Sequence, residues 1–345
     1  MKGLRPQAPA MNGRSAWLAG FLGAAVLSIV AARCERASAR PLPLTVVRDI
    51  PIAQMTRRFD YASLDPRTGL LLVADLAGGR VLVFDARRDR LVKAIAGVQG
   101  AHGVLAVPQL GRVYASATGV DQVVAIDEAT LAIVARTAGG HYPDGIAFAP
   151  GQHRLFVSDE IGRTVGVIDT LSNTLVKIIQ AGGGVGNTEF DSASGLIFTN
   201  VQTKNQLIGI DPATGAIVSH DPLPGCVENH GLLIDAPRRL AWIACQGNAR
   251  LITFSFRRHA VIDSQSVGRE PDVLAYDPTR TRLYVAGEVG VVSVFDVAAE
   301  KPRKIGEAFA GDNAHIVAVD PTTGHVFLPL RNVAGKSVLR VMRAD

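Results

Sequence analysis

Several short motifs that mark common enzyme classes are absent from the sequence. No glycine-rich loop opens a helix to bind phosphate, because the glycines of residues 182–186 lie between two apolar repeats and are interpreted as a connector. The sequence has no His-Glu-x-x-His motif of a zinc protease and no Gly-x-Ser-x-Gly nucleophile elbow. Phosphate-loop, zinc-protease and α/β-hydrolase chemistry is therefore not expected.

The sequence also lacks the composition of a disordered chain and the charge pattern of a nucleic-acid-binding protein. Of its 345 residues, 48% are hydrophobic and 19% are charged, which is enough apolar material for a large core. Lys and Arg are scattered along the chain rather than gathered in a stripe, so nucleic acid is not expected as a partner.

The first 39 residues show the three-part pattern of a secretory signal. Arg14 precedes a mostly apolar stretch of 17 residues, 16–32, and the small residues at 37–39 offer a cleavage site. A start at Met11 would give a signal of more ordinary length. The apolar stretch is near the lower limit for a membrane span, so a retained anchor is the alternative. We predict a periplasmic or secreted protein that contacts a membrane only if the signal is retained.

Removal of this segment changes the charge of the chain. Residues 1–39 hold five of the 36 Lys and Arg residues and one of the 31 Asp and Glu residues. The remaining chain then has 31 basic and 30 acidic residues and is almost neutral. The basic character of the full sequence therefore does not indicate a basic binding surface.

A repeat with a period of about 42 residues runs through the rest of the sequence. Short apolar runs end in aspartates that follow one another at this interval: Asp85, Asp127, Asp169 and Asp211. The run returns at residues 251–255 and 292–296, and weakly at 338–342. A fixed period of this length with strands inside it marks a repeat architecture.

Each repeat contains the patterns of four short strands. The first ends at a turn that often contains Asp-Pro, the second is an apolar run such as residues 70–74, the aspartate closes the third, and a more variable run such as 91–96 is the fourth. Seven such repeats predict an all-β fold, a seven-bladed β-propeller of four-stranded blades in a single domain over residues 40–345. The last repeat ends after three strands, so residues 42–52 are expected to supply its fourth strand and close the ring.

The third repeat has a distinctive sequence. It runs from His141-Tyr-Pro-Asp-Gly through Arg154-Leu-Phe-Val-Ser-Asp to Thr164-Val-Gly-Val-Ile-Asp. This pattern resembles the YVTN repeat of secreted bacterial β-propellers of the YncE type, and the likeness covers nearly all of the chain after the signal. The resemblance implies the architecture but not an activity, because similar rings include binding proteins, surface proteins, lactonases and lyases.

The residue just before each predicted first strand is polar in all seven repeats. Because the innermost strand of a blade lines the central channel, these side chains are expected to surround one mouth of it: Asp60, His102, Asp144, Asn187, His230, Asp272 and His315. We predict that this ring binds a small ligand or a metal ion. Arg57 and Arg58, just ahead of the ring, could bind an anionic ligand, and Arg331, in a loop that faces the same way, is a further candidate for ligand binding.

Three interpretations of this ring stay open. Polar residues before strands can simply satisfy loop amides. The imidazoles of His102, His230 and His315, together with the ring carboxylates, could hold a divalent metal ion such as Zn, Cu, Mn or Ca, with the asparagine of the ring as a further oxygen ligand for Ca. Alternatively, a histidine beside a carboxylate such as Asp272 could act in acid–base catalysis. We predict a binding or interaction protein for a small molecule or a protein partner, with a metal-dependent lactonase or lyase as the alternative.

The fifth repeat contains the only two cysteines after the signal. Folding its first strand onto its second, about the turn at residues 236–239, brings Cys245 beside His230 and places Cys226 nearby. In an exported protein these cysteines are predicted to form a disulfide. A soft-metal site made of Cys226, His230 and Cys245 is the alternative.

Overall fold

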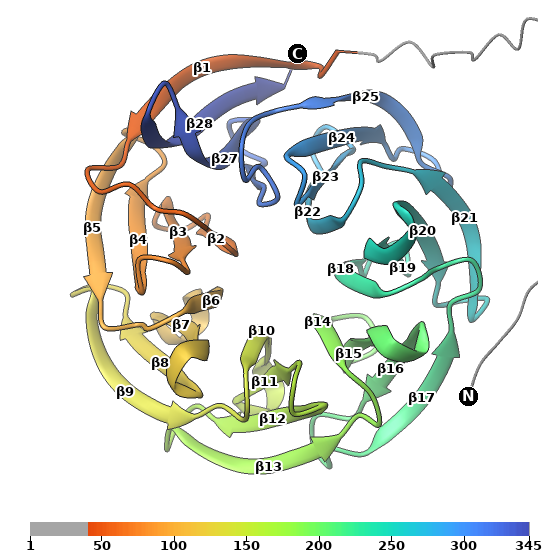
Figure 1. Cartoon of the computed structure of the whole chain (residues 1–345). Coiled ribbons are helices and arrows are strands. Elements are labelled where there is room, and N and C mark those ends of the chain that lie inside the picture. Colours follow the sequence, from red (N-terminus) through yellow and green to blue (C-terminus); the bar gives the residue numbers. More distant parts are fainter. Residues whose placement is uncertain (1–40, 345) are drawn as a thin grey trace, which may run out of the picture. The chain divides into compact units, whose positions relative to one another are not determined.

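The chain forms a ring of antiparallel sheets around a central channel (Figure 1). The computed structural model describes residues 41–344, and this part of the chain contains seven four-stranded sheets. The predicted seven-bladed β-propeller is thereby confirmed. The signal predicted at residues 1–39 lies outside the described residues. Within the described part of the chain, no helix is long and apolar enough to cross a membrane.

Blades one to six are each built from four consecutive strands, with the first strand innermost. The strands of blades one to three are β2 (Ala62–Asp65), β3 (Leu70–Asp75), β4 (Arg80–Asp85), β5 (Arg90–Ala96), β6 (Ala101–Val107), β7 (Arg112–Ala117), β8 (Gln122–Asp127), β9 (Ala132–Ala138), β10 (Pro143–Ala149), β11 (Arg154–Asp159), β12 (Thr164–Asp169) and β13 (Thr174–Gln180).

The other blades follow the same plan, and short 3-10 helices occupy some of the connections. The strands of blades four to six are β14 (Val185–Asp191), β15 (Leu196–Val201), β16 (Gln206–Ile210), β17 (Ile217–Pro222), β18 (Asn229–Asp235), β19 (Leu240–Cys245), β20 (Arg250–Ser255), β21 (Ala260–Ser266), β22 (Pro271–Asp277), β23 (Arg282–Gly287), β24 (Val291–Asp296) and β25 (Arg303–Phe309). Blade seven contains β26 (Ala318–Asp320), β27 (His325–Val333), β28 (Lys336–Ala344) and β1 (Leu44–Pro51). The 3-10 helices are η1 (Pro108–Leu110), η2 (Thr118–Val120), η3 (Pro150–Gln152), η4 (Gln202–Lys204) and η5 (Gln246–Asn248).

The aspartates at the 42-residue interval form the turn after the third strand. The Oδ1 atom of Asp85 accepts hydrogen bonds from the backbone N–H groups of Arg87 and Arg88, at 3.1 and 3.0 Å. The carboxylate of Asp127 accepts one from the N–H of Thr130 at 3.0 Å. Such side-chain bonds satisfy the turn's backbone donors, so these aspartates have a structural role in the blades.

The two middle strands of each blade are buried on both faces. In β3, Leu71, Leu72 and Val73 have no exposed surface, although alternate side chains point to opposite faces of the sheet. This agrees with the runs of consecutive apolar residues in the sequence. The outer strand β5 is mostly exposed. Each blade therefore packs against the blades on both sides, and the core is divided among the spaces between blades.

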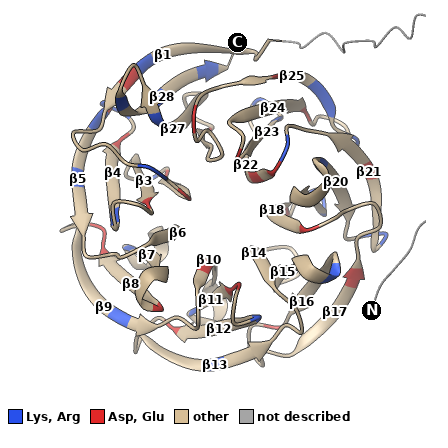
Figure 2. Cartoon of the chain, viewed as in Figure 1, with Lys and Arg blue, Asp and Glu red and all other residues tan. Residues whose placement is uncertain are grey.

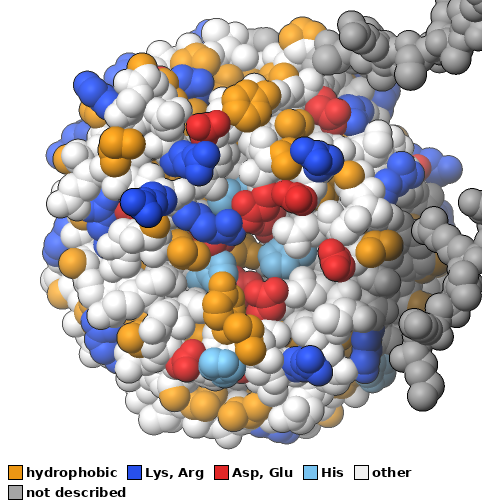
Figure 3. All heavy atoms as spheres, viewed as in Figure 1, with side chains coloured by type: hydrophobic (Ala, Val, Ile, Leu, Met, Phe, Trp, Pro, Cys, Tyr) orange, Lys and Arg blue, Asp and Glu red, His pale blue; other side chains and the backbone are white. Residues whose placement is uncertain are grey.

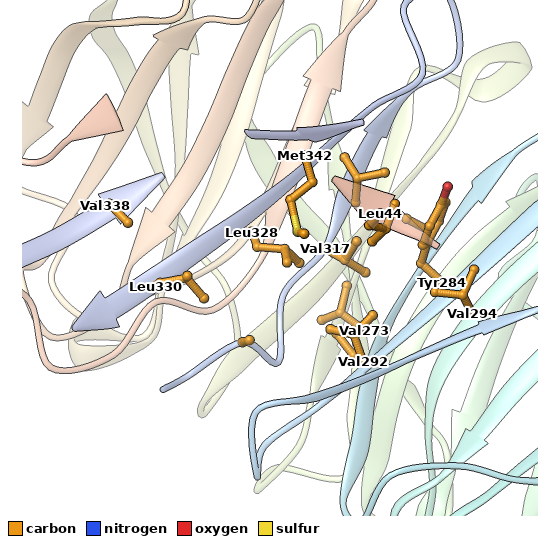
Figure 4. Packing of buried hydrophobic residues seen from close by; sticks show 14 residues of the cluster. Leu44, Val273, Tyr284, Val292, Val294, Val317, Leu328, Leu330, Val338 and Met342 are labelled. Atoms are coloured by element: carbon orange, nitrogen blue, oxygen red, sulfur yellow. The ribbon is translucent and has the colours of Figure 1, made fainter. Parts of the chain in front are cut away.

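The last blade combines the two ends of the described chain. The order of its sheet is β1-β28-β27-β26, and the β1–β28 pairing runs from Leu44 opposite Ala344 to Pro51 opposite Val338. This pairing confirms the predicted closure by an N-terminal strand. Leu44 lies in a buried cluster that also includes Val294 of blade six (Figure 4). Strand β1 thus ties blade seven both to its own sheet and to its neighbour.

Blade five contains a disulfide between Cys226 and Cys245. The two Cα atoms lie 5.3 Å apart, and Cys245 is opposite Asn229 in the β18–β19 pairing. Both side chains are buried. Because the sulfurs are bonded to each other, neither is a free thiolate, and the soft-metal alternative would require a reduced protein.

Loss of packing under β1 is expected to destabilise the whole ring. Ile50 is only 6% exposed and lies in a cluster with residues of β3, β4, β27 and β28. Ile50→Ala should lower the free energy of unfolding by about 2–5 kcal/mol, the usual cost of emptying such a site. Val46→Ala, at a position in the same strand that is 48% exposed, should change it by less than about 0.5 kcal/mol. Chemical denaturation measures both, and equal effects would show that β1 does not hold the ring closed.

Candidate functional site at the channel mouth

Six of the seven predicted ring residues occupy equivalent positions at the start of the inner strands. Strand pairing aligns them, and they are Asp60, His102, Asp144, His230, Asp272 and His315. The acidic residues at the inner ends of the blades are visible in Figure 2. Figure 3 shows acidic and histidine side chains gathered around the hollow at the centre of this face. The structure therefore brings these six predicted residues together.

Blade four is shifted by one residue relative to the predicted alignment. Pro143 pairs with Asp159 at the end of β11, and Val185 pairs with Val201 at the end of β15. The residue equivalent to Asp144 is consequently Gly186, and Asn187 lies one position farther along the channel. A Cβ atom on Gly186 would lie 2.9 Å from the carbonyl oxygen of His230, so close packing of blade five favours glycine there.

His102 lies between two carboxylates. Its Nε2 atom is 2.7 Å from Asp60 Oδ2, and its Nδ1 atom is 3.6 Å from Asp144 Oδ1 and 3.5 Å from Thr118 Oγ1. The Thr118 hydroxyl donates to the carbonyl of Pro143, so its oxygen can accept from His102. Burial alone would lower the pKa of His102, but the two aspartates raise it to about 10. His102 is therefore an imidazolium at neutral pH.

His230 is also held between two acceptors. Its Nδ1 atom is 3.0 Å from Gln202 Oε1, and its Nε2 atom is 3.3 Å from Asp272 Oδ1. The amide nitrogen of Gln202 donates to Glu160 at 2.8 Å, which turns the amide oxygen toward His230. Burial opposes the charge, but Asp272 raises the pKa of His230 to about 9. The same contact lowers the pKa of Asp272 against the effect of its burial.

His315 differs from the other two histidines because it faces a hydrogen-bond donor. The backbone N–H of Phe59 donates to Asn313 Oδ1 at 2.9 Å, which leaves the amide nitrogen of Asn313 to donate to His315 Nδ1. Glu288 lies 3.6 Å from the same Nδ1, but both of its oxygens already accept from Arg58, at 2.6 and 3.2 Å. This assigns the proton of a neutral His315 to Nε2. That atom is fully buried and 3.9 Å from Asp272 Oδ2.

Arg58 joins the two halves of the ring. Besides Glu288, its guanidinium lies 3.5 Å from Asp60 Oδ2. Two of the three arginines predicted as ligand contacts lie elsewhere: Arg57 is exposed, and Arg331 pairs with Asp312 at 3.7 Å. Within residues 41–344, neither has a hydrogen bond or ion pair to a ring residue. Arg58, the third predicted arginine, contacts Asp60 of the ring. Gln202 contacts His230 and Glu288 contacts His315, while Glu160 contacts Gln202.

Three buried polar atoms of the ring have no hydrogen-bond partner among the described residues. They are Asp144 Oδ1, Asp272 Oδ1 and His315 Nε2. The two carboxylate oxygens are near imidazole nitrogens, but the distance or angle does not satisfy hydrogen-bond geometry. Buried polar groups in folded proteins are nearly always satisfied, so these atoms identify the place where the ring can accept a ligand, an ion or water.

A tyrosine and an asparagine meet across the channel below the ring. The Tyr61 hydroxyl of blade one donates to Asn187 Oδ1 of blade four, and these blades are not neighbours in the ring. Burial, with the nearby aspartates, raises the pKa of Tyr61 well above its usual value, so it remains a neutral donor. The pairing of these two residues is not predicted by the repeat pattern. The repeat does contain a signal for these two residues. They occupy equivalent positions in their blades, and three other blades have glycine there: Gly103, Gly145 and Gly231.

One group of ring residues has the spacing of a metal site. Ligand atoms of Asp60, Asp272 and His315 all lie within 4.8 Å of one another. The hydrogen bond from Asn313 opposes direct ligation by His315 Nε2, because a metal-bound imidazole nitrogen must be unprotonated. Both aspartates also face an imidazolium. The distances between the ligand atoms thus suit a metal ion, whereas the protons on and around these ligands do not.

Comparisons with known proteins support the fold and go no further. No protein-family model matches the sequence, and no curated protein matches it. Hydrazine synthase of Kuenenia stuttgartiensis superposes with a TM-score of 0.71 at 14% identity, over 85% of this chain and 99% of that chain. The WD40 repeats of RRP9 superpose with a TM-score of 0.72 at 9% identity, over 89% of this chain and 99% of that one.

These similarities identify the architecture. The chain is a β-propeller. At 14% and 9% identity, the two solved structures carry no information about activity or ligand for this propeller. Membership of the YVTN family stays a prediction from the sequence of the third repeat.

The charged histidines should give the propeller a distinctive pH dependence. The pKa values of His102 and His230 are raised to about 10 and 9, so their stabilising effect is complete below about pH 6.5 and is lost as pH rises through those values. His102→Gln and His230→Gln should each flatten the fall of unfolding free energy between pH 7 and 10, whereas His220→Gln, at an exposed position, should not. Denaturant titrations across this range measure the slopes. Identical slopes in all variants would mean that the two ring histidines are not charged.

Proposed function

We propose that this propeller is a binding protein that holds a small polar ligand at the ring of its channel mouth. The observation that carries the proposal is that three buried polar atoms of the ring, on Asp144, Asp272 and His315, make no hydrogen bond with any described residue. A ring needed only to satisfy loop amides would have no reason to leave these atoms without partners. Six blades contribute a polar residue at the same register, and their side chains differ, which is how a repeat scaffold builds an asymmetric site.

The chemistry of these three atoms describes the ligand. Asp144 Oδ1 and Asp272 Oδ1 are acceptors, and the assigned tautomer makes His315 Nε2 a donor. Burial raises the pKa of Asp144 to about 6, so this carboxyl is mostly ionised at neutral pH. Three carboxylates then face two imidazolium groups. The ring suits a compact molecule with at least two donors and one acceptor, neutral or singly positive.

Binding fits this site better than acid–base catalysis by its histidines. A general base works best when its pKa lies near the working pH. His102 and His230 are protonated at neutral pH, and His315 Nδ1 already accepts a hydrogen bond. Asp144, with a pKa of about 6, is the ring group best poised for proton transfer. A lactonase or lyase activity would therefore depend on Asp144 or on a bound metal.

Divalent metal binding is the second candidate. It is favoured by the spacing of Asp60, Asp272 and His315. Binding would require displacement of imidazolium groups from the two aspartates, so metal affinity should rise between pH 7 and pH 10 as the histidines lose their protons.

Other features of the chain support a proposed location and proposed partners for the protein. The signal pattern supports export, and the Cys226–Cys245 disulfide is the kind of bond that persists in oxidising compartments. An exported ligand-binding role would agree with the resemblance to YVTN propellers. A protein partner at the same face is compatible with the exposed loops around the ring.

A thermal-shift panel tests the ligand class. Ethanolamine, glycinamide and urea, which are rich in donors, should stabilise the wild-type protein, whereas acetate and phosphate should not. A ligand at 100 times its Kd stabilises by about 2.7 kcal/mol. Asp144→Asn and Asp272→Asn should remove the shift, and Asp211→Asn, in an exposed turn, should keep it. If no compound shifts the wild type more than the ring variants, the ring is not a ligand site.

Metal analysis decides the second candidate. The purified protein would be titrated with Zn²⁺, Mn²⁺ and Ca²⁺ at pH 7 and 9, and bound metal would be measured by mass spectrometry of the native protein. Metal binding at the ring predicts one ion per chain, tighter at pH 9, and at least about a tenfold loss of affinity in Asp60→Asn. Binding that Asp60→Asn leaves unchanged would place the metal elsewhere and remove this candidate.

A further inference from the structure

A cavity occupies the channel on the other side of Tyr61 and Asn187. Its volume is about 540 Å³, within the usual range of small-molecule pockets, and residues of all seven blades line it. The layer two residues below the polar ring is mainly aliphatic, with Val104, Ile146, Leu232, Leu274 and Val317. Pro108 and Pro150, beside the turns at the far ends of inner strands, also line it. The cavity therefore extends toward the face opposite the polar ring.

Glu189 is the only charged residue in the lining of this cavity. It belongs to inner strand β14, and strand pairing aligns it with residues that carry no charge in the other blades: Ser63, Leu105, Ala147, Leu233, Ala275 and Ala318. A single departure from an uncharged pattern in seven repeats is the kind of difference by which a repeat protein forms a specific site.

The structural role of this side chain does not require a carboxyl group. Glu189 Oε2 accepts a hydrogen bond from the backbone N–H of Ile234 in the next blade at 2.9 Å. Ser63 makes the same link between blades one and two, where its hydroxyl accepts from the N–H of Ala106 at 3.1 Å. A neutral side chain therefore suffices for the link. Glu189 Oε1 has no hydrogen-bond partner among the described residues, and the side chain is partly exposed to the channel.

The surroundings of Glu189 contain no compensating charge. Burial raises its pKa to about 8, against a smaller opposite effect of the Ile234 hydrogen bond. No Lys, Arg or His lines the cavity, and Tyr61 is the only other titratable residue in the lining. The Tyr61 hydroxyl is directed to Asn187. An anionic molecule would thus find no favourable partner, whereas a cation would meet an unpaired carboxyl group in a medium of low polarity.

We propose that this cavity binds a small amphipathic amine, with its ammonium group on Glu189 and its apolar body against the aliphatic layer of the channel. The proposal concerns a second site, independent of the ligand site at the polar ring, because the Tyr61–Asn187 bond lies between them. Below pH 8, the bound ammonium favours the ionised form of Glu189, so the carboxyl proton passes to solvent when the amine binds.

Calorimetric titration with matched ligands tests the charge requirement. The probes are 2-phenylethylamine and adamantylamine, their neutral counterparts 2-phenylethanol and adamantanol, and the anion 3-phenylpropanoate. At pH 7 at least one amine should bind about tenfold or more tightly than its alcohol, and the anion should not bind. Amine affinity should rise between pH 6 and 8, and buffers of different ionisation enthalpy should reveal proton release. Equal affinities of both amines and their alcohols would overturn the proposal.

Variants assign the binding to the cavity. Glu189→Gln keeps an oxygen that can accept the hydrogen bond from the backbone N–H of Ile234 but removes the ionisable group. The variant should therefore stay folded but lose the preference for amines over alcohols and the release of a proton on binding. Ala106→Phe, which fills the cavity, should weaken all apolar probes. Asp272→Asn at the polar ring should leave amine binding unchanged. Amine binding that persists in Glu189→Gln, or that is lost in Asp272→Asn, would contradict the second site.

Discussion

The pairing of β1 with β28 is the interaction on which the rest of the molecule depends. Each blade packs against its neighbours, so the ring has a fixed diameter only when the last blade is complete and meets the first. Strand β1 supplies the outer strand of blade seven and packs toward blade six through Leu44. With the circle closed, seven inner strands stand around one axis. Side chains far apart in the chain, such as Tyr61 and Asn187, can then meet across the channel.

The polar ring illustrates how a buried cluster of charges is made tolerable. Buried charges are costly unless they are paired and hydrogen-bonded. The protonated His102 lies between Asp60 and Asp144, and the protonated His230 lies against Asp272. The neutral His315 is oriented by an amide instead of a second carboxylate. Charge pairing thus accounts for most of the ring, and a few buried atoms that make no hydrogen bond with a described residue define the candidate site.

The repeat pattern predicts the scaffold well because its signals are local. The turn aspartates, the runs of buried strands and the missing strand of the last repeat all depend on neighbours in the chain, and the structure agrees with each of them. The same alignment assigned Asn187 to the ring, whereas strand pairing gives that position to Gly186. A shift of one residue in blade four is not visible in a repeat whose spacings already vary between 42 and 43 residues.

By itself, the sequence determined the number of blades, the closure of the ring and six polar residues at one channel mouth, because a period and a strand pattern are properties of short segments. Tertiary structure alone decided which of these residues touch, which histidines carry a proton and which side chains meet across the channel. Those features depend on distances between different blades. Glu189 shows the difference plainly: its departure from the repeat is present in the sequence, but only the folded ring places its carboxyl group in a cavity without a positive partner.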